Sequence, residues 1–202
     1  MIRVVCVDIS SAREETYRRL YENASVQRKR RADRYLRQED RLRCVTAEAM
    51  LRHFLGVTED QIERTGFGKP YIRDRKDVFC NLSHSGRYVV LAWGDTEVGV
   101  DVQEQDPAVD RCALAMHFFT PDERDYAGED IGRFYEIWTK KESYLKYTGR
   151  GLRTDLRSFS VLSERREVRF FSRTLDGDHS LSLCTEEDDY GFALLDIQRL
   201  LS

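Results

Sequence analysis

A glutamate lies among the aromatic residues of one predicted helix, where an apolar side chain is expected. In the segment WTKKESYLKYTGRGL, Glu142 falls between Trp138 and Leu145 on one helical face. A carboxylate on or beside a core-facing stripe is costly unless it is paired or binds a metal. The structural alternative is a boundary residue whose head reaches water, or an i,i+4 pair with Lys146, and the helix by itself favours that alternative.

A pair of oxygen ligands is predicted on the strand EVGVDVQ. Alternation along a strand turns the three valines of this segment to one side and Asp101 and Gln103 to the other. The Cα atoms of Asp101 and Gln103 are then about 6.6–7 Å apart, so their oxygens can converge on one ion. Magnesium prefers a few hard oxygen ligands together with waters and substrate phosphates. A half-exposed strand with a polar outer face is the alternative, and the strand alone favours it.

A basic run, RKRRADRYLRQEDRLR, occupies residues 28–43 and holds eight Arg or Lys against three acids. Arginine suits a phosphate-binding surface because its planar fork can grip two oxygens at once. A solvated helix with ion pairs such as Asp33 with Arg37 explains the pattern equally well.

Two shorter segments could also meet a phosphate. In NLSHSG, Ser83 and His84 are expected where a strand ends, and a hydroxyl, backbone N–H groups and an imidazole there can hold an anion. A turn with capping hydroxyls is the alternative. A Ser–His hydrolase lacks its G-x-S-x-G elbow. In FGKP, Lys69 lies beside a turn and is by itself an ordinary solvated lysine, and no Walker A or G-x-G-x-x-G pattern occurs.

Composition limits the class of protein. A chain of 202 residues is long enough for a real core, in one large domain or two small ones. A net charge of -3 argues against a generic nucleic-acid or membrane binder. Five scattered cysteines without a C-x-x-C pair indicate reduced cytosolic thiols. The start, MIRVVCVDIS, is typical of a strand and not of a signal peptide or membrane span, so we expect a cytoplasmic protein.

The elements that must position these residues mix helices and strands. We expect a strand at residues 2–8, a charged helical region over residues 12–55 and a helix at residues 132–148. Further strands are expected at VFCNL and RYVVLAW, joined by SHSG, and at SFSV, EVRFF, HSLSLC and YGFALLDI. ALAMHFF is expected to be helical, and Thr120 then fits the N-cap of a following helix, with Glu123 as its capping-box partner.

The motifs occur in an informative order. The sequence runs basic helix, G-K-P, N-L-S-H-S, G-V-D-V-Q, F-F-T-P-D-E and W-T-K-K-E-S-Y-L-K. This order closely resembles the Sfp-type 4′-phosphopantetheinyl transferases, which activate carrier proteins of nonribosomal peptide and polyketide synthesis. The resemblance covers about residues 28–161, and its strongest blocks surround Ser83, Asp101 and Glu142.

The resemblance implies an α+β fold of two pseudo-two-fold-related halves in one monomer, with the active site in the cleft between them. We place the first half, with the coenzyme's adenine and 3′-phosphate contacts, at residues 1–95. The second half, with the metal ligands and the catalytic helix, is placed at residues 96–202. A weak internal echo, AEAMLRHFLG at 47–56 and KESYLKYTG at 141–149, agrees with two related halves.

The resemblance also implies a reaction. The family transfers 4′-phosphopantetheine from coenzyme A to a serine of an apo acyl or peptidyl carrier protein, releases 3′,5′-ADP and uses Mg²⁺. Asp101 and Glu142 match the acidic metal ligands, and Gln103 stands where many members have glutamate. Lys146 matches the lysine that contacts the pyrophosphate. Glu142 is our first candidate for the base, directly or through a water on the metal.

The coenzyme contacts follow from the same resemblance. Ser83 and His84 match residues that hold its phosphates, with His84 near the 3′-phosphate. The remaining matches are the segment against adenine and the candidate 3′-phosphate contacts, namely Gly68, Lys69, Pro70, Arg28, Arg31 and Arg43.

Two other functions compete with a holo-[carrier-protein] synthase. Residues 28–43 motivate a basic-helix module that docks nucleic acid, with affinity that falls with salt. A metal-dependent nucleotide hydrolase without a carrier partner would use the same acidic residues. The resemblance favours the transferase, acting as a monomer without nucleic-acid or membrane partners.

Overall fold

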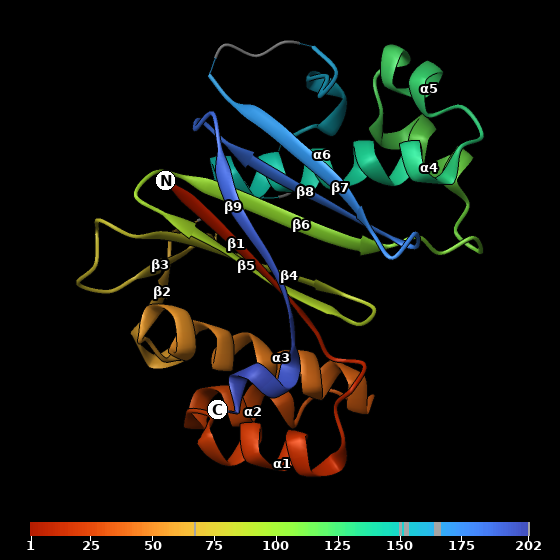
Figure 1. Cartoon of the computed structure of the whole chain (residues 1–202). Coiled ribbons are helices and arrows are strands. Elements are labelled where there is room, and N and C mark those ends of the chain that lie inside the picture. The colour runs from red at the N-terminus through yellow and green to blue at the C-terminus, as the bar shows by residue number, and fades with distance from the viewer. Residues whose placement is uncertain (67, 150, 152–153, 164–166, 202) are drawn as a thin grey trace.

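In both halves of the chain a strand is followed by a run of helices and then by further strands (Figure 1). The computed structural model describes residues 1–66, 68–149, 151, 154–163 and 167–201. In the first half lie β1 Ile2–Asp8, α1 Glu14–Asn23, α2 Val26–Ala32, α3 Gln38–Met50, the π-helical turn η1 Leu51–Leu55, η2 Glu59–Gln61, β2 Ile62–Arg64, β3 Pro70–Ile72, β4 Phe79–Ser85 and β5 Tyr88–Gly94. In the second half lie β6 Val98–Glu104, α4 Arg111–Phe118, α5 Pro121–Ala127, α6 Ile131–Thr148, η4 Leu156–Ser158, β7 Arg169–Leu175, β8 His179–Thr185, β9 Tyr190–Asp196 and η5 Ile197–Leu200.

The two main sheets repeat one topology. In the first, β1 pairs antiparallel with β5, which pairs antiparallel with β4. In the second, β6 pairs antiparallel with β8, which pairs antiparallel with β7. A strand, a helical segment and a hairpin thus follow one another twice, and β9 returns to pair parallel with β1. The predicted α+β fold of two related halves is confirmed.

An apolar layer joins the two sheets. Ile2, Val4 and Cys6 of β1 point into it, and the valines of β6 meet them from the other sheet. All of these side chains are at most 1% exposed. The predicted alternation of β6 is therefore confirmed, with Val98, Val100 and Val102 on the side away from Asp101.

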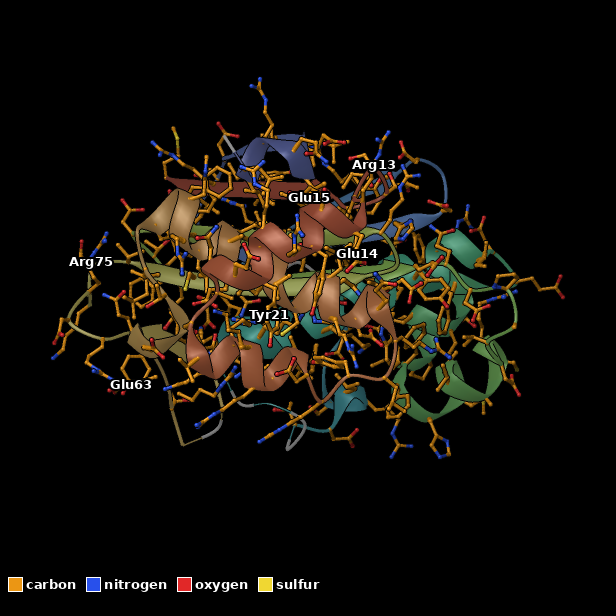
Figure 2. The ribbon with its side chains drawn as sticks, turned by 90° about the horizontal axis from the view of Figure 1, so that it is seen from below. Arg13, Glu14, Glu15, Tyr21, Glu63 and Arg75 are labelled. Carbon is orange, nitrogen blue, oxygen red and sulfur yellow. The ribbon has the colours of Figure 1, made fainter. Side chains whose placement is uncertain are left out.

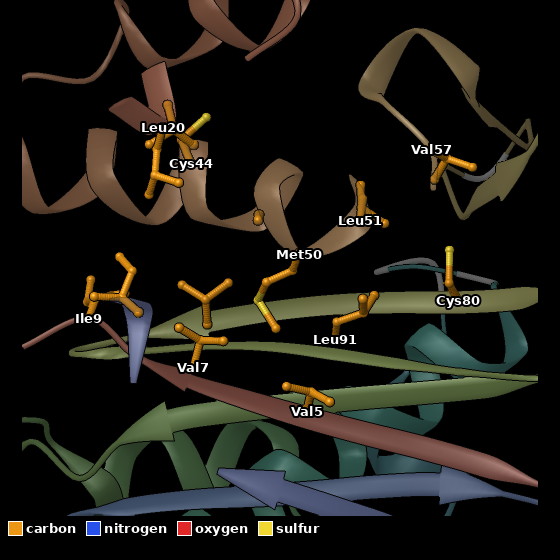
Figure 3. Close-up of a cluster of buried hydrophobic side chains, with 14 of the residues drawn as sticks. Val5, Val7, Ile9, Leu20, Cys44, Met50, Leu51, Val57, Cys80 and Leu91 are labelled. Atoms are coloured by element: carbon orange, nitrogen blue, oxygen red, sulfur yellow. The ribbon is translucent and has the colours of Figure 1, made fainter. Parts of the chain in front are cut away.

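Helices cover the outer faces of both sheets. Figure 3 shows α3 and η1 placing Met50 and Leu51 against Val5, Val7 and Leu91 of the first sheet. Seen from below in Figure 2, α1 crosses the outside of this layer, with Arg13, Glu14, Glu15 and Tyr21 on it. On the second sheet α6 is the covering helix, and α4 and α5 lie beside its first turns (Figure 1).

Several local predictions need correction. β4 continues through Ser85, so SHSG is not a turn, and the hairpin turns at Gly86, whose φ is +50°. SFSV is not a strand, because residues 156–158 form the 3₁₀ turn η4. The basic run is not one helix either, since it breaks between α2 and α3. Asp33 lies in that break and accepts a hydrogen bond from Tyr21.

Other local predictions are confirmed. Thr120 caps α5 in a capping box with Glu123, and Pro121 stands in the first turn. The two segments of the internal echo end equivalent helices, and each is stopped by a glycine in the left-handed region, Gly56 with φ +69° and Gly149 with φ +66°. Among the described residues, no helix has both the length and the apolar character to cross a membrane.

Candidate active site

The two sheets meet at their edge strands, β4 and β6, through side chains. Three polar side chains of β4 accept hydrogen bonds from alternate backbone N–H groups of β6, at 3.1, 3.3 and 3.0 Å. The pairs are Asn81 with Val100, Ser83 with Val102, and Ser85 with Glu104. These bonds satisfy the free edge of β6 and bring Ser83 of the first half next to Asp101 of the second.

Asp101 is the buried centre of this junction, with 2% of its surface exposed. One carboxylate oxygen accepts from the Ser83 hydroxyl at 2.8 Å and from the Lys146 ammonium at 2.7 Å. The other accepts from the Gln103 amide at 3.3 Å, which confirms that the two side chains share one face of β6. That face is not half-exposed, because a Cβ on Gly99 would lie 2.0 Å from the Ser143 carbonyl oxygen of α6.

Glu142 and Lys146 stand one turn apart on α6 and face the same space. Glu142 is half-buried, and burial, with a smaller contribution from the nearby Asp101 charge, raises the pKa of its carboxyl. Lys146 opposes that shift. The Lys146 ammonium also donates to the Val100 carbonyl at 3.0 Å. This hydrogen bond and the ion pair of Lys146 with Asp101 together hold α6 against β6. The inward-facing carboxylate predicted from the helix is therefore present.

A cavity of about 360 Å³ opens between the halves in front of these groups. Its walls come from α2, α3, the β2–β3 hairpin and β4 on one side and from α6 on the other. The predicted site residues that line it are Arg28, Arg31, Gly68, Lys69, Pro70, His84, Glu142 and Lys146. Of the described residues predicted to act here, Ser83, Asp101, Gln103 and Arg43 lie outside that lining.

The arginines of the basic run have different environments. Arg28 is 5% exposed, forms an ion pair with Glu59, and has Glu48 at 3.9 Å from its Nε. Arg31 reaches the other Glu59 oxygen at 2.5 Å, and its side chain is 40% exposed. Sequence reasoning missed both glutamates, because their pairing depends on α3, which carries Glu48, and η2, which carries Glu59, packing against α2. Arg28 is thus neutralised by its surroundings, whereas Arg31 keeps a face toward the cavity.

Arg43 and His84 meet beside the β4–β5 turn. Arg43 donates to the Gly86 carbonyl and pairs with Asp40 at 2.6 Å. The pKa of His84 is lowered, first by burial and then by the positive charges of Arg43 and Lys146. A neutral imidazole with cations on two sides is suited to an anionic ligand, whose charge would draw a proton onto the ring.

A second buried charge pair on α6 was not predicted as such. Lys141 and Glu123 are both fully buried and 2.8 Å apart. Glu123 also accepts from the backbone of Val161, and Lys141 donates to the carbonyls of Leu156 and Phe159. The pair ties the segment after α6 to α5, so Glu123 is more than the helix cap expected from the sequence.

The donor set suits a magnesium ion. Asp101 and Glu142 offer hard carboxylate oxygens, and burial, followed by the Asp101 charge, raises the pKa of Glu142, so a cation between them would favour the charged carboxylate. Among the described residues, no group of three or more His, Cys, Asp or Glu is placed to hold a metal. Two carboxylates are nevertheless enough for Mg²⁺, which usually keeps several waters and binds substrate phosphates.

Comparison with known proteins agrees with this arrangement. Residues 97–195 match the 4′-phosphopantetheinyl transferase superfamily, and residues 11–96 match the family described as 4′-phosphopantetheinyl transferase, N-terminal. The chain is 29% identical to a Bacillus subtilis 4′-phosphopantetheinyl transferase, with 89% of each chain covered.

Two further relatives are closer in identity over shorter spans. The chain is 30% identical to 4′-phosphopantetheinyl transferase Sfp of Bacillus subtilis (strain 168), covering 73% of this chain and 70% of the relative. It is 36% identical to 4′-phosphopantetheinyl transferase psf-1 of Bacillus pumilus, covering 69% of this chain and 64% of the relative. The chain therefore belongs to the Sfp-type 4′-phosphopantetheinyl transferases.

Proposed function

We propose that this chain transfers the 4′-phosphopantetheine group of coenzyme A to a serine of an apo acyl or peptidyl carrier protein, with Mg²⁺, releasing 3′,5′-ADP. Family membership supports the reaction class. The observation that carries the proposal is one cavity with cations on one wall and the carboxylate and ammonium of Glu142 and Lys146 on the other. Both walls come from one chain, so we expect a monomer to be active.

The coenzyme is oriented by charge. Its 3′-phosphate faces the first half, where Arg31 and His84 line the cavity and Arg43 lies behind His84. Its adenine lies against the segment Gly68–Pro70. The pyrophosphate then reaches Lys146, which adds positive charge on the leaving side. Ser83 supports this end by fixing Asp101 through their 2.8 Å hydrogen bond.

Asp101 and Glu142 would hold the magnesium ion, with Gln103 as a neutral oxygen donor beside Asp101. The ion supplies positive charge against the pyrophosphate oxygens and so stabilises the departing 3′,5′-ADP. In the structure the Gln103 amide nitrogen is directed at Asp101, which keeps the two side chains together on β6.

Glu142 is proposed as the general base. The carrier serine oxygen forms a bond to the phosphorus that bears pantetheine, the bond from that phosphorus to the oxygen of 3′,5′-ADP breaks, and the serine proton passes to Glu142. A carboxyl with a raised pKa is better matched to this role than an ordinary surface glutamate. Lys146 lies one turn away from Glu142 on α6 and forms an ion pair with Asp101. One helix therefore positions both the proposed base and the cation of the site.

The two competing functions have lost their support. The nucleic-acid module rested on residues 28–43, but Arg28 is buried between carboxylates and Arg31 faces the cavity. The hydrolase alternative would use the same carboxylates, but the relatives are transferases.

A mass-shift assay tests the proposal directly. The chain is mixed with coenzyme A, magnesium and several apo-carrier proteins, and each carrier is weighed by mass spectrometry. We expect the mass gain of one phosphopantetheine on at least one carrier, lost when the carrier serine is changed to alanine or EDTA is added. No gain on any carrier would count against transferase activity, and release of nucleotide without a carrier would favour a hydrolase.

A further inference from the structure

The ammonium of Lys69 lies between the two halves. Lys69 belongs to the first half, directly before β3, and its side chain is only 11% exposed. Its Nζ donates to the Tyr147 carbonyl of α6 at 2.5 Å and forms an ion pair with Glu97, just before β6. Both partners belong to the second half, so this ammonium bridges the two halves at a residue that also lines the cavity.

The contact with Tyr147 completes the end of α6. The last carbonyls of a helix have no intrahelical donor, and the helix dipole places partial negative charge there. Gly149 satisfies one of them by donating to Leu145 at 3.0 Å. The carbonyl of Tyr147 instead receives a cation from a residue 78 positions away. Such a cation is the favourable partner for a helix C-terminus.

The fit around this ammonium is close. A Cβ on Gly149 would lie 2.9 Å from Cδ of Lys69, and the Lys69 ammonium is 5.8 Å from the ring centre of Tyr147. From β6, a Cβ on Gly99 would lie 2.4 Å from the Tyr147 nitrogen. The last turn of α6 therefore packs closely against both β6 and Lys69.

We propose that Lys69 is a positioning residue that fixes the end of α6 against the first half, and so sets Glu142 and Lys146 at the right distance from the coenzyme-binding wall. The proposed transfer needs this, because the 3′-phosphate and the pyrophosphate of one coenzyme molecule meet cations on different halves. A separation of the halves would misplace Lys146 without changing its chemistry. This inference rests on the proposed function and adds a role for the Lys69 side chain.

Kinetics of four variants test the role. Lys69→Met keeps the apolar stem and removes the charge, Lys69→Arg keeps the charge, and Glu97→Gln weakens the ion pair. Lys76→Met, at an exposed lysine in the next loop, is the matched control. We expect Lys69→Met to raise KM for coenzyme A and lower kcat, each by about tenfold, because a charged hydrogen bond across the site is lost. Lys69→Arg should stay within about threefold of wild type and Lys76→Met should equal it.

Hydrogen exchange supplies a readout that does not require turnover. In Lys69→Met, amides of the last turn of α6 and of residues 65, 66 and 68 should exchange faster than in wild type, while those of β5 should not change. Faster exchange everywhere would indicate general loosening and overturn the proposal, as would KM and kcat of Lys69→Met within twofold of Lys76→Met. If wild type transfers nothing to any carrier, the proposed function fails, and the exchange result still decides whether Lys69 fixes α6.

Discussion

β1 and β6 occupy equivalent places in the two halves but present opposite chemistry to their helices. Both strands begin the repeated unit, and both pair antiparallel with the last strand of the following hairpin. Counted from that pairing, Val5 corresponds to Asp101 and Val7 to Gln103, because Asp8 pairs with Tyr88 as Glu104 pairs with His179. The helix-facing side of β1 is apolar, and that of β6 is polar.

The covering helices differ in the same way. α3 buries Cys44, Val45 and Met50 in a continuous apolar core, as Figure 3 shows for Cys44 and Met50. α6 buries Thr139 and Ser143 over its sheet instead. The Thr139 hydroxyl lies 2.7 Å from the Ser182 hydroxyl of β8 and also donates to the backbone of its own helix. The buried hydroxyls of Thr139 and Ser182 are thus paired with each other.

The difference separates stability from chemistry. An apolar helix–sheet contact gains free energy from the area it removes from water, and it tolerates no unpaired charge. A polar helix–sheet contact gains less free energy, and each of its buried polar groups needs a hydrogen-bond partner. We therefore expect such a contact where its polar groups act on a ligand. By this argument the first half supplies a stable frame with the proposed binding wall, and the second half supplies the proposed reacting groups.

Replacing each of the corresponding residues Val5 and Asp101 by the other's residue type should give the largest effects. Val5→Asp places a carboxylate in the apolar core of the first half and should lower the free energy of unfolding by at least about 3 kcal/mol, or prevent folding. Asp101→Val should fold, because Lys146 can turn into the cavity, but its transfer rate should fall to background. Urea unfolding and the mass-shift assay measure the two effects. A stable Val5→Asp or an active Asp101→Val would contradict the division between the halves.

Glu142→Gln tests the reacting group itself. The change removes charge and basicity at nearly constant volume, so the fold should persist while kcat falls by about 10²–10⁴-fold, the usual range for a general base. Single-turnover transfer to one carrier measures the loss, and circular dichroism checks the fold. An activity within a few-fold of wild type would remove Glu142 from the mechanism.

The first-half arginines sharpen the comparison at the binding wall. Arg28→Ala removes the buried cation between Glu48 and Glu59, leaves Glu59 with Arg31 alone, and should lower the free energy of unfolding by about 3–5 kcal/mol. Arg31→Ala removes only the more exposed partner of Glu59, so it should lower stability less than Arg28→Ala, and it should raise KM for coenzyme A about tenfold through loss of a phosphate contact. Dephospho-coenzyme A, which lacks the 3′-phosphate, is the control substrate. An equal rise of KM with both substrates would show that Arg31 does not contact the 3′-phosphate.

Much of this site was predictable because local pattern determines it. Strand alternation placed Asp101 and Gln103 together, helix periodicity turned Glu142 inward, and the capping box at Thr120 marked the start of α5. The order of the motifs, read from the sequence, supplied the resemblance to the family. At these positions the local pattern and the overall fold require the same residues, which is expected of a sequence that specifies one structure.

The errors and omissions share a cause, which is dependence on distant contacts. Glu59 pairs with Arg28 because η2 folds back on α2, and Lys69 bonds to Tyr147 because the halves close on each other. No periodicity in one segment reports either pair. SHSG was read as a turn because its small polar residues fit one, but Ser83 and Ser85 instead bond to the edge of β6.

Ionisation of the Glu142 carboxyl should make stability depend on pH, with a smaller effect than the substitutions above. The folded pKa of its carboxyl is raised above the ordinary 4.5, so its contribution to stability is fully present below the unfolded pKa and is lost as pH rises through the folded pKa. In EDTA, Glu142→Gln should therefore melt higher than wild type at pH 7, and the advantage should shrink as pH falls toward 4.5. Melting curves at several pH values measure this. A constant difference at all pH values would assign it to packing.

Gln103 should show the smallest effect, because it is the neutral member of the polar face. Its amide lies 3.3 Å from Asp101, and its oxygen can be offered to magnesium without charge. A water can fill a vacated magnesium position, so Gln103→Ala should lose only a few-fold in rate and recover part of it at high magnesium. Asp101→Ala removes an anionic ligand and the partner of Lys146, so magnesium should not rescue it. Gln103→Glu should be tolerated and should lower the magnesium needed for half-maximal rate. A magnesium titration of the three variants with one carrier separates these outcomes, and a Gln103→Ala as inactive as Asp101→Ala at saturating magnesium would show that Gln103 does more than supply a replaceable ligand.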